Sequence, residues 1–189
     1  MGINLGLMGF GVIGRKLYSE SLRCDDLNIH AVCDIGDPDI LTYLIKKEFD
    51  NTKDIYFKDN YLLSNNNKAR FLNAVNPGDV AWDLFDLDFV IDCTGKFKSF
   101  DVIYKHIDAG AKKIIISTLP IDSIDRLVVY GVNEETISKK DKTISAGSST
   151  MNALALLLKS VIHFGIESVN MTTIHSYTSD QSLQDVAGK

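Results

Sequence analysis

The stretch INLGLMGFGVIG, residues 3–14, decides the fold. The apolar run over residues 3–8 predicts a buried strand, and the spacing that follows is typical of a helix. Between them Gly9, Gly11 and Gly14 form G-x-G-x-x-G, in which the first glycine permits a tight turn and the second lets the backbone approach a pyrophosphate. The third lets the helix pack against the strand, and the helix N-terminus offers N–H groups to phosphate. This stretch therefore predicts a dinucleotide-binding turn.

An acidic residue supports this interpretation. Residues 28–34 predict a second strand that ends in Asp34, 20 residues past Gly14. A carboxylate there accepts hydrogen bonds from the ribose hydroxyls of adenosine and repels a 2′-phosphate, which favours NAD over NADP as the cofactor. The alternative is a glycine-rich turn in an unrelated α/β protein, with Asp34 as an ordinary cap.

A later turn adds to the expected cofactor site. Residues 93–97, CTGKF, end a strand predicted over residues 87–95 and contain Thr94 and Gly95. A turn at the carboxyl edge of a doubly wound sheet lies beside the cofactor cleft. The alternative is a plain β-to-α turn.

Strands and helices alternate along most of the chain. Helices are predicted over residues 37–49, where a cap precedes Pro38, and over residues 99–110, which Ser99 opens and Gly110 ends. Short β-prone pieces between residues 54 and 74, broken by SNNNK, predict an inserted hairpin. Further strands are predicted over residues 111–118, 126–133 and 142–147. The predicted class is α/β, with a Rossmann-like, doubly wound, mostly parallel sheet.

The last part of the chain predicts the start of a second domain. In SAGSSTMNALALLLKSV, residues 145–161, hydroxyl side chains precede an apolar helical run, with Leu154, Leu157, Leu158 and Val161 on one side. Residues 166–181 alternate as a strand does. We expect an NAD-binding domain over residues 1–147, and the first helix and strand of an incomplete second domain over residues 148–189.

Ser149 and His175 form a candidate catalytic pair. Ser149 lies in the first turn of its helix, where the macrodipole favours negative charge, and the following strand can return His175 to that turn. Spacing alone favours a simpler interpretation, because Ser-Ser-Thr before an apolar run is typical of N-capping. Serine hydrolase chemistry is disfavoured, since the sequence has neither a nucleophile elbow nor an evident orienting acid.

The composition narrows the classes of partner. A net charge of −5 gives no electrostatic basis for binding nucleic acid or an anionic membrane. Cys24, Cys33 and Cys93 form neither a disulfide framework nor a metal-binding pattern, so we expect no metal. The sequence has no secretion signal and no apolar stretch of membrane-spanning length, and we expect a cytoplasmic protein.

Seven segments together resemble the NAD-dependent, phosphorylating glyceraldehyde-3-phosphate dehydrogenases, which are oxidoreductases of glycolysis. They fall in order between residues 3 and 185: INLGLMGFGVIGRKL, YLIKKEFDNTKD, DCTGKF, HIDAGAKKIIIST, VVYGVN, SAGSSTMNALALLLKSV and TTIHSYTSDQSLQD. Family members continue beyond the last of these segments, so the resemblance is to their N-terminal half.

The resemblance implies a reaction and a set of site residues. In the family a cysteine at the helix start attacks an aldehyde, hydride passes to the nicotinamide, and phosphate releases the acyl group. The cysteine position falls on Ser149 and the base on His175. The resemblance further implies a phosphorylated aldehyde and inorganic phosphate as substrates, and a homo-oligomer. Phosphate contacts fall on Ser148, Thr150 and Thr178, and cofactor contacts on Phe10, Gly11, Ile13, Asp34 and Thr94.

Ser149 is the main departure from the family pattern. A serine hydroxyl is far less acidic than a thiol, and a helix dipole worth about 0.3–1 kcal/mol does not close that gap. Val12 also stands where the family commonly has an arginine, and residues 72–82 lack its usual Arg-Asp-Pro motif. We expect an NAD-binding protein of this type with little or no phosphorylating activity. The alternative is a non-catalytic NAD-binding or protein-interaction module.

Overall fold

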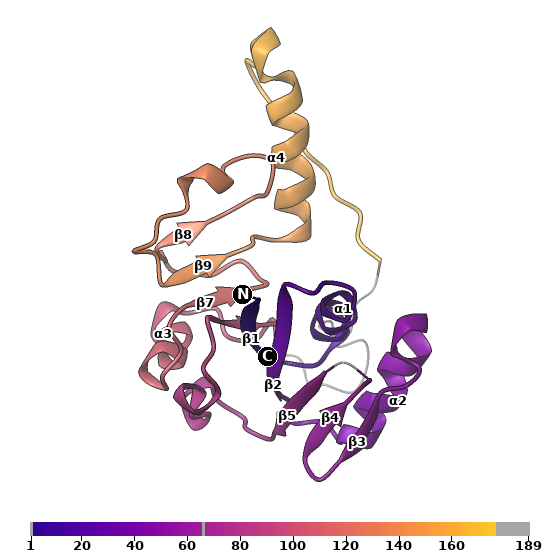
Figure 1. The fold of residues 1–189 in the computed structure, drawn as a ribbon. Helices are drawn as coiled ribbons and strands as arrows, with labels where there is room; N and C mark the ends of the chain where they lie inside the picture. Colours follow the sequence, from indigo (N-terminus) through magenta and orange to yellow (C-terminus); the bar gives the residue numbers. More distant parts are fainter. Residues whose placement is uncertain (1, 66, 177–189) are drawn as a thin grey trace, which may run out of the picture.

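A mostly parallel sheet forms the centre of the molecule (Figure 1). The computed structural model describes residues 2–65 and 67–176, and within these ranges nine strands follow the order β3-β4-β5-β2-β1-β6-β7-β9-β8. The two pairings made by β4 are antiparallel and the others are parallel, which confirms the predicted sheet with its inserted hairpin. The strands are β1 (Ile3–Met8), β2 (Leu27–Cys33), β3 (Tyr56–Lys58), β4 (Tyr61–Leu63), β5 (Lys68–Leu72), β6 (Phe89–Asp92), β7 (Ile114–Ile116), β8 (Arg126–Leu127) and β9 (Thr143–Ser145).

Helices cover both faces of this sheet, so it is doubly wound. The helices are α1 (Val12–Ser21), α2 (Pro38–Glu48), α3 (Phe100–Asp108) and α4 (Ser149–Val161). Neighbouring residues of β1 point to opposite faces: Leu7 belongs to the apolar core under α1 and α2, and Met8 to the core under α3. None of the helices in the described ranges is long and apolar enough to cross a bilayer.

The helix starts follow the predicted caps with one difference. Asp37 caps α2 as expected, because its Oδ1 accepts hydrogen bonds from the N–H groups of Asp39 (2.9 Å) and Ile40 (3.1 Å). Ser99 precedes α3, but its side chain makes no capping hydrogen bond. The N–H of Phe100 donates instead to Asp122 Oδ2 at 2.9 Å, so a loop residue caps this helix.

The inserted hairpin contains a turn that the sequence analysis missed. Asp59 and Asn60 join β3 to β4 with φ angles of 52° and 60°, the left-handed pair that a tight hairpin turn requires. The predicted SNNNK break lies between β4 and β5. Because β5 then pairs in parallel with β2, the hairpin extends the main sheet.

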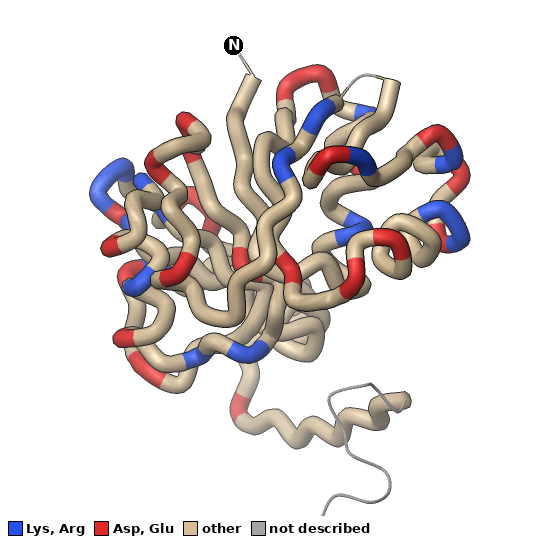
Figure 2. Tube along the Cα trace, turned by 90° about the horizontal axis from the view of Figure 1, so that it is seen from below, with Lys and Arg blue, Asp and Glu red and all other residues tan. Residues whose placement is uncertain are grey.

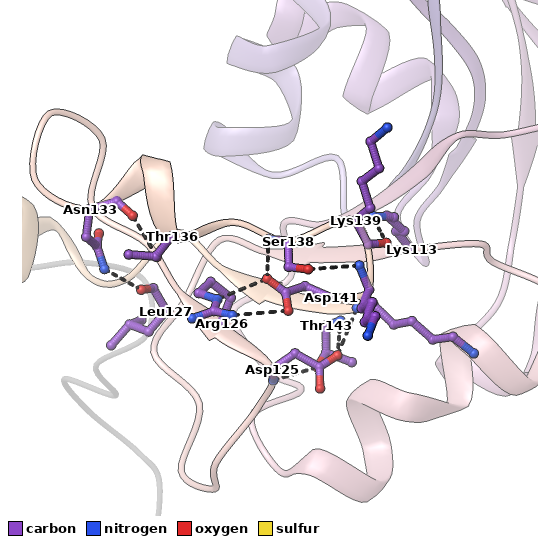
Figure 3. A network of polar contacts seen from close by, with 12 residues as sticks. Lys113, Asp125, Arg126, Leu127, Asn133, Thr136, Ser138, Lys139, Asp141 and Thr143 are labelled. Atoms are coloured by element: carbon purple, nitrogen blue, oxygen red, sulfur yellow. Dashed lines mark hydrogen bonds and ion pairs between the residues drawn. The ribbon is translucent and has the colours of Figure 1, made fainter.

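A polar network holds the opposite edge of the sheet (Figure 3). Arg126 of β8 binds Asp141 through Nε at 2.9 Å, and the N–H of Ser138 donates to the same carboxylate at 2.8 Å. The hydrogen bond from Arg126 is the main cause that lowers the pKa of Asp141. These contacts join β8 to the turn before β9.

The strand predicted over residues 126–133 is mostly wrong, since only Arg126 and Leu127 form a strand. Asn133 explains the difference. Its Oδ1 accepts the N–H of Val129 at 2.8 Å. Its Nδ2 donates to the carbonyl of Leu127 at 3.0 Å (Figure 3). The side chain thus takes backbone groups that a longer strand would use.

The helix α4 extends away from the sheet, and an extended segment runs back along it (Figure 1). No residue of α4 is buried, so the predicted apolar side of this helix lies against no core. The strand predicted over residues 166–181 is wrong in its described part, because residues 166–176 form no strand. A strand needs a neighbour for its backbone groups, and the described residues provide none for this segment. Thr178 lies outside the described residues.

Candidate functional site

A cleft of about 190 Å³ opens at the carboxyl ends of β1, β2 and β6. The strands β2 and β6 lie on opposite sides of β1, so the crossover connections run in opposite directions from this point. Open α/β sheets bind ligands at such a switch point. The cleft is lined by Met8, Gly9, Gly11, Cys33, Asp34, Ile35, Ala74, Val75, Cys93, Thr94, Lys96 and Phe97.

The three glycines of the first turn have different steric surroundings. Gly9 has a φ of +91°, and a Cβ on it would lie 2.8 Å from the nitrogen of Thr94. A Cβ on Gly14 would lie 2.1 Å from the carbonyl oxygen of Gly9, so the helix packs too close to the turn for any residue but glycine at this position. A Cβ on Gly11 would meet no atom within 4 Å, and no side chain caps α1. Gly11 therefore leaves open space at the helix start, as a bound pyrophosphate requires.

Asp34 is held rigidly at the end of β2. Its Oδ2 accepts the N–H of Phe10 at 2.6 Å, and its Oδ1 accepts the N–H of Gly36 at 2.7 Å. A carboxylate has about four acceptor sites, so two remain for a ligand's hydroxyl groups. These free acceptor sites fit the ribose hydroxyl groups of a dinucleotide.

The predicted cofactor residues divide into two groups. Gly9, Gly11, Asp34 and Thr94 line the cleft, whereas Phe10, Ile13, Gly14 and Gly95 do not. The ring of Phe10 is fully buried and packs edge-on against Tyr18, with 5.6 Å between centroids. Phe10 thus contributes its N–H to Asp34 and its ring to the core.

The buried side of α1 includes a charged residue. Val12 and Ile13 are 70% and 52% exposed, while Arg15 is buried. Arg15 donates from Nε and Nη2 to the two carboxylate oxygens of Glu48 at 2.7 and 2.6 Å, and from Nη1 to the carbonyl of Phe10 at 2.9 Å. Sequence reasoning missed this bond, because Glu48 lies 33 residues away on α2.

Thr94 lies in the wall of the cleft beside β6, and the buried Asp92 holds it there from behind. Asp92 Oδ1 accepts both the N–H of Thr94 (2.8 Å) and its hydroxyl (2.6 Å). The hydroxyl oxygen in turn accepts the N–H of Lys96 at 3.2 Å, and Gly95 has a φ of +67°. These bonds fix the turn that follows the strand.

Two thiols lie at the base of the cleft. Burial raises the pKa of Cys33 to about 11 and that of Cys93 to about 12. Both therefore stay protonated at neutral pH and act as small apolar side chains.

The start of α4 forms a second, open cleft of about 450 Å³. Ser148 caps α4, because Ser148 Oγ accepts the N–H of Met151 at 3.1 Å. His175 does return to the helix start, where its Nε2 lies 3.3 Å from Thr150 Oγ1. Ser149 and His175 line the same cleft, but within the described ranges no hydrogen bond joins them.

These features define the class of the protein. A parallel sheet, a glycine turn at its switch point and an acidic residue at the end of the second strand make a dinucleotide-binding domain of the Rossmann type. Residues 3–100 match the family described as "Glyceraldehyde 3-phosphate dehydrogenase, NAD binding domain", and the chain belongs to this family.

The chain is also similar to full-length proteins named glyceraldehyde-3-phosphate dehydrogenase. It is 36% identical over 187 residues to that of Mycoplasma pneumoniae, covering 97% of this chain and 56% of the relative. It is 38% identical over 195 residues to that of Buchnera aphidicola and 35% identical over 195 residues to that of Geobacillus stearothermophilus, each match covering 100% of this chain and 58% of the relative. The chain thus spans about half the length of these curated relatives.

Proposed function

We propose that residues 1–147 bind NAD as the cofactor domain of a protein of the glyceraldehyde-3-phosphate dehydrogenase type, and that residues 148–189 begin its catalytic domain. The cleft at the switch point carries this proposal, because it combines the open space at Gly11 with the fixed carboxylate of Asp34. The start of α1 would hold the pyrophosphate and Asp34 the adenosine ribose. When bound, NAD supplies the hydride acceptor.

Calorimetric titration with NAD and NADP tests this proposal. We expect NAD to bind at least about tenfold more tightly, a difference of about 1.4 kcal/mol, because Asp34 repels the 2′-phosphate. Asp34→Asn should narrow that ratio while keeping an acceptor for the Phe10 N–H. Absence of binding by both dinucleotides at millimolar concentration would refute the proposal.

We further propose that Ser149 occupies the nucleophile position and that His175 is the base beside it. A phosphorylated aldehyde and inorganic phosphate would bind there, with contacts from Ser148, Thr150 and Thr178. The exposed serine lies at the first position of α4 and shares its cleft with His175, which supports this assignment. Since serine lacks a thiol's acidity, we propose that phosphorylating activity is very low or absent.

Two measurements test this assignment. NADH formation by the unchanged chain, dependent on both aldehyde and phosphate, would overturn the proposed inactivity. Ser149→Cys places a thiol at the helix start, and that thiol should react with iodoacetamide faster than the exposed Cys24. Adding His175→Ala should slow the new thiol. Equal rates with and without His175 would contradict the pairing.

A second candidate is a non-catalytic NAD-binding or interaction module, and the exposed apolar side chains of residues 148–176 favour it. Phe164 and Ile174 are 80% and 95% exposed. Exposed apolar side chains of this kind support the proposed homo-oligomer as well. Sedimentation analysis tests self-association, because a monomer at all concentrations would contradict the proposed homo-oligomer.

The three free cysteines support a reducing compartment, the cytoplasm.

A further inference from the structure

A buried pair of ionisable side chains lies directly behind the cleft wall at β6. His106 of α3 is fully buried, and Asp92 at the end of β6 is 2% exposed. His106 Nε2 lies 3.3 Å from Asp92 Oδ2. Neither residue lines the cleft, and the proposed chemistry uses neither.

The two carboxylate oxygens of the buried Asp92 face different partners. A buried carboxylate is costly unless it is paired and hydrogen-bonded. Asp92 Oδ1 accepts two hydrogen bonds from Thr94, and Oδ2 faces His106. A proton on His106 Nε2 completes this arrangement, because the carboxylate can only accept. Asp92 therefore joins α3 to the turn at Thr94.

The imidazole ring of His106 makes no other hydrogen bond in the described part of the chain. Its Nδ1 is buried without a partner, and its ring packs against Trp82 with 6.0 Å between centroids. Leaving a buried polar nitrogen unpartnered is unfavourable, so packing alone would be served better by an apolar side chain. The contact with Asp92 is what the imidazole adds.

The position of Thr94 matters for the cleft because it touches the glycine turn. A Cβ on Gly9 would lie 2.8 Å from the nitrogen of Thr94 and 2.9 Å from its Cγ2. The neighbouring Cys93 N–H donates to the carbonyl of Met8 at 2.6 Å. A shift of Thr94 would therefore change the spacing between the two walls of the cleft.

We propose that His106 and Asp92 are positioning residues for dinucleotide binding, which act through the turn at Thr94 and Gly95. This inference rests on the proposed function. Asp34 lies on the β2 side of β1 and Thr94 on the β6 side. The two halves of such a sheet each hold one mononucleotide of the dinucleotide. The His106–Asp92 pair therefore supports the mononucleotide that does not contact Asp34. Loss of this pair weakens NAD binding more than AMP binding.

The test compares NAD and AMP affinities by calorimetry for matched variants of the full chain. His106→Leu should weaken NAD binding about tenfold, whereas AMP should change less than about twofold. His106→Gln keeps an N–H donor toward Asp92 and should restore NAD affinity to within about threefold of the unchanged chain. His30→Leu, which removes a half-buried histidine of β2, is the control and should leave both affinities unchanged.

Thr94→Val provides a second route if His106→Leu does not fold. Valine keeps the shape of threonine and removes the hydroxyl that Asp92 holds, while Thr94→Ser keeps it. We expect the valine variant to lose NAD affinity selectively and the serine variant to retain it.

Each other outcome is also decisive. Lower thermal stability with unchanged NAD affinity in His106→Leu would reduce the pair to a structural role and overturn the inference. Equal weakening of NAD and AMP would do the same, because it indicates general damage to the cleft. If the unchanged chain binds neither ligand, the proposed function fails and this inference fails with it.

Discussion

The sheet unit (residues 3–65 and 67–147) and the arm (residues 148–176) have similar apolar sequence patterns, but their apolar side chains differ in burial. Leu7 in the sheet unit is fully buried, whereas Leu157 in the arm is 61% exposed. In the sheet unit every strand has a neighbour and both faces carry helices. The helix α4 still forms, because a helix pairs its own backbone groups, but residues 166–176 form no strand. Apolar periodicity thus predicts a strand only where the fold supplies a neighbouring strand, whereas a helix can form without a packing partner.

The arm also differs from the sheet unit in charge. Figure 2 shows acidic and basic residues interspersed over the sheet unit, whereas Lys159 and Glu167 are the charged residues of the arm. Lys159 attaches the arm, since its Nζ donates to the carbonyls of Gly131 (2.7 Å) and Val132 (3.1 Å). The arm is therefore connected to the sheet unit by a few polar contacts and by no core.

The largest expected difference between the two regions is the cost of removing a leucine side chain. Leu7→Ala leaves a cavity in the core and should lower the free energy of unfolding by about 2–5 kcal/mol. Leu157→Ala should change it by less than about 0.5 kcal/mol, because the side chain is mostly exposed. Urea unfolding followed by fluorescence measures both, since the single tryptophan, Trp82, is buried in the sheet unit. Similar costs for the two variants would show that Leu157 is buried in solution.

The second expected effect concerns ion pairs that differ in burial. Glu48→Gln leaves the buried Arg15 guanidinium without its counter-charge and should cost about 1–3 kcal/mol. Lys16→Ala breaks an exposed pair with Glu20 on the same helix and should cost less than about 0.5 kcal/mol. High salt should increase the difference between these two stability costs, because screening weakens the exposed ion pair. Equal costs would contradict a special role of Arg15 in joining α1 and α2.

Sequence reasoning predicted the parts of the site that depend on local spacing. Gly9, Gly11 and Gly14 lie within six residues, so one turn determines their geometry. Asp34 follows from the end of the second strand, and the parallel sheet brings it to the same edge. These predictions need only the alternation of strand and helix.

The parts that escaped prediction depend on contacts between distant residues. Arg15 was indistinguishable from a solvent-exposed helix residue until α2 placed Glu48 beside it. His106 and Asp92 belong to different elements, and nothing in the pattern of either shows that they meet. The resemblance places Phe10 among the cofactor residues but gives no sign that its ring packs in the core. In each case the packing of elements, rather than their type, decides the role.

The third expected effect compares the caps of α2 and α4. Asp37→Ala removes the cap of a helix that packs on the core, and should lower the free energy of unfolding by about 1 kcal/mol. Ser148→Ala removes the cap of α4 and should leave the fluorescence-detected transition unchanged. The loss should register instead as reduced helical circular dichroism and faster amide exchange in α4. A lower urea midpoint for Ser148→Ala would show that α4 unfolds together with the sheet unit.

The smallest expected effect is a loss of stability in acid, which belongs to the edge network of the sheet unit. Arg126 lowers the pKa of Asp141, and for Asp125 the hydrogen bonds from Lys142 and Thr143 outweigh burial, so that its pKa is lowered too. In the unfolded chain both carboxylates protonate near the usual value of about 3.9, so below it the unfolded state binds more protons. Their stabilisation is therefore complete above that pH and is lost as the pH falls through the lower folded-state pKa values.

Urea midpoints measured between about pH 6 and pH 3 follow this loss, with Trp82 as the probe of the sheet unit. Asp141→Asn should lower stability at neutral pH and flatten the acid dependence, because it removes one of the two linked groups. Asp25→Asn is the control, since this exposed carboxylate forms no ion pair within the described ranges. An unchanged acid slope in Asp141→Asn would show that Asp141 does not contribute to the acid sensitivity. Because Glu167 is the only acidic residue of the arm, the helical signal of α4 should survive the acid loss that the sheet unit shows.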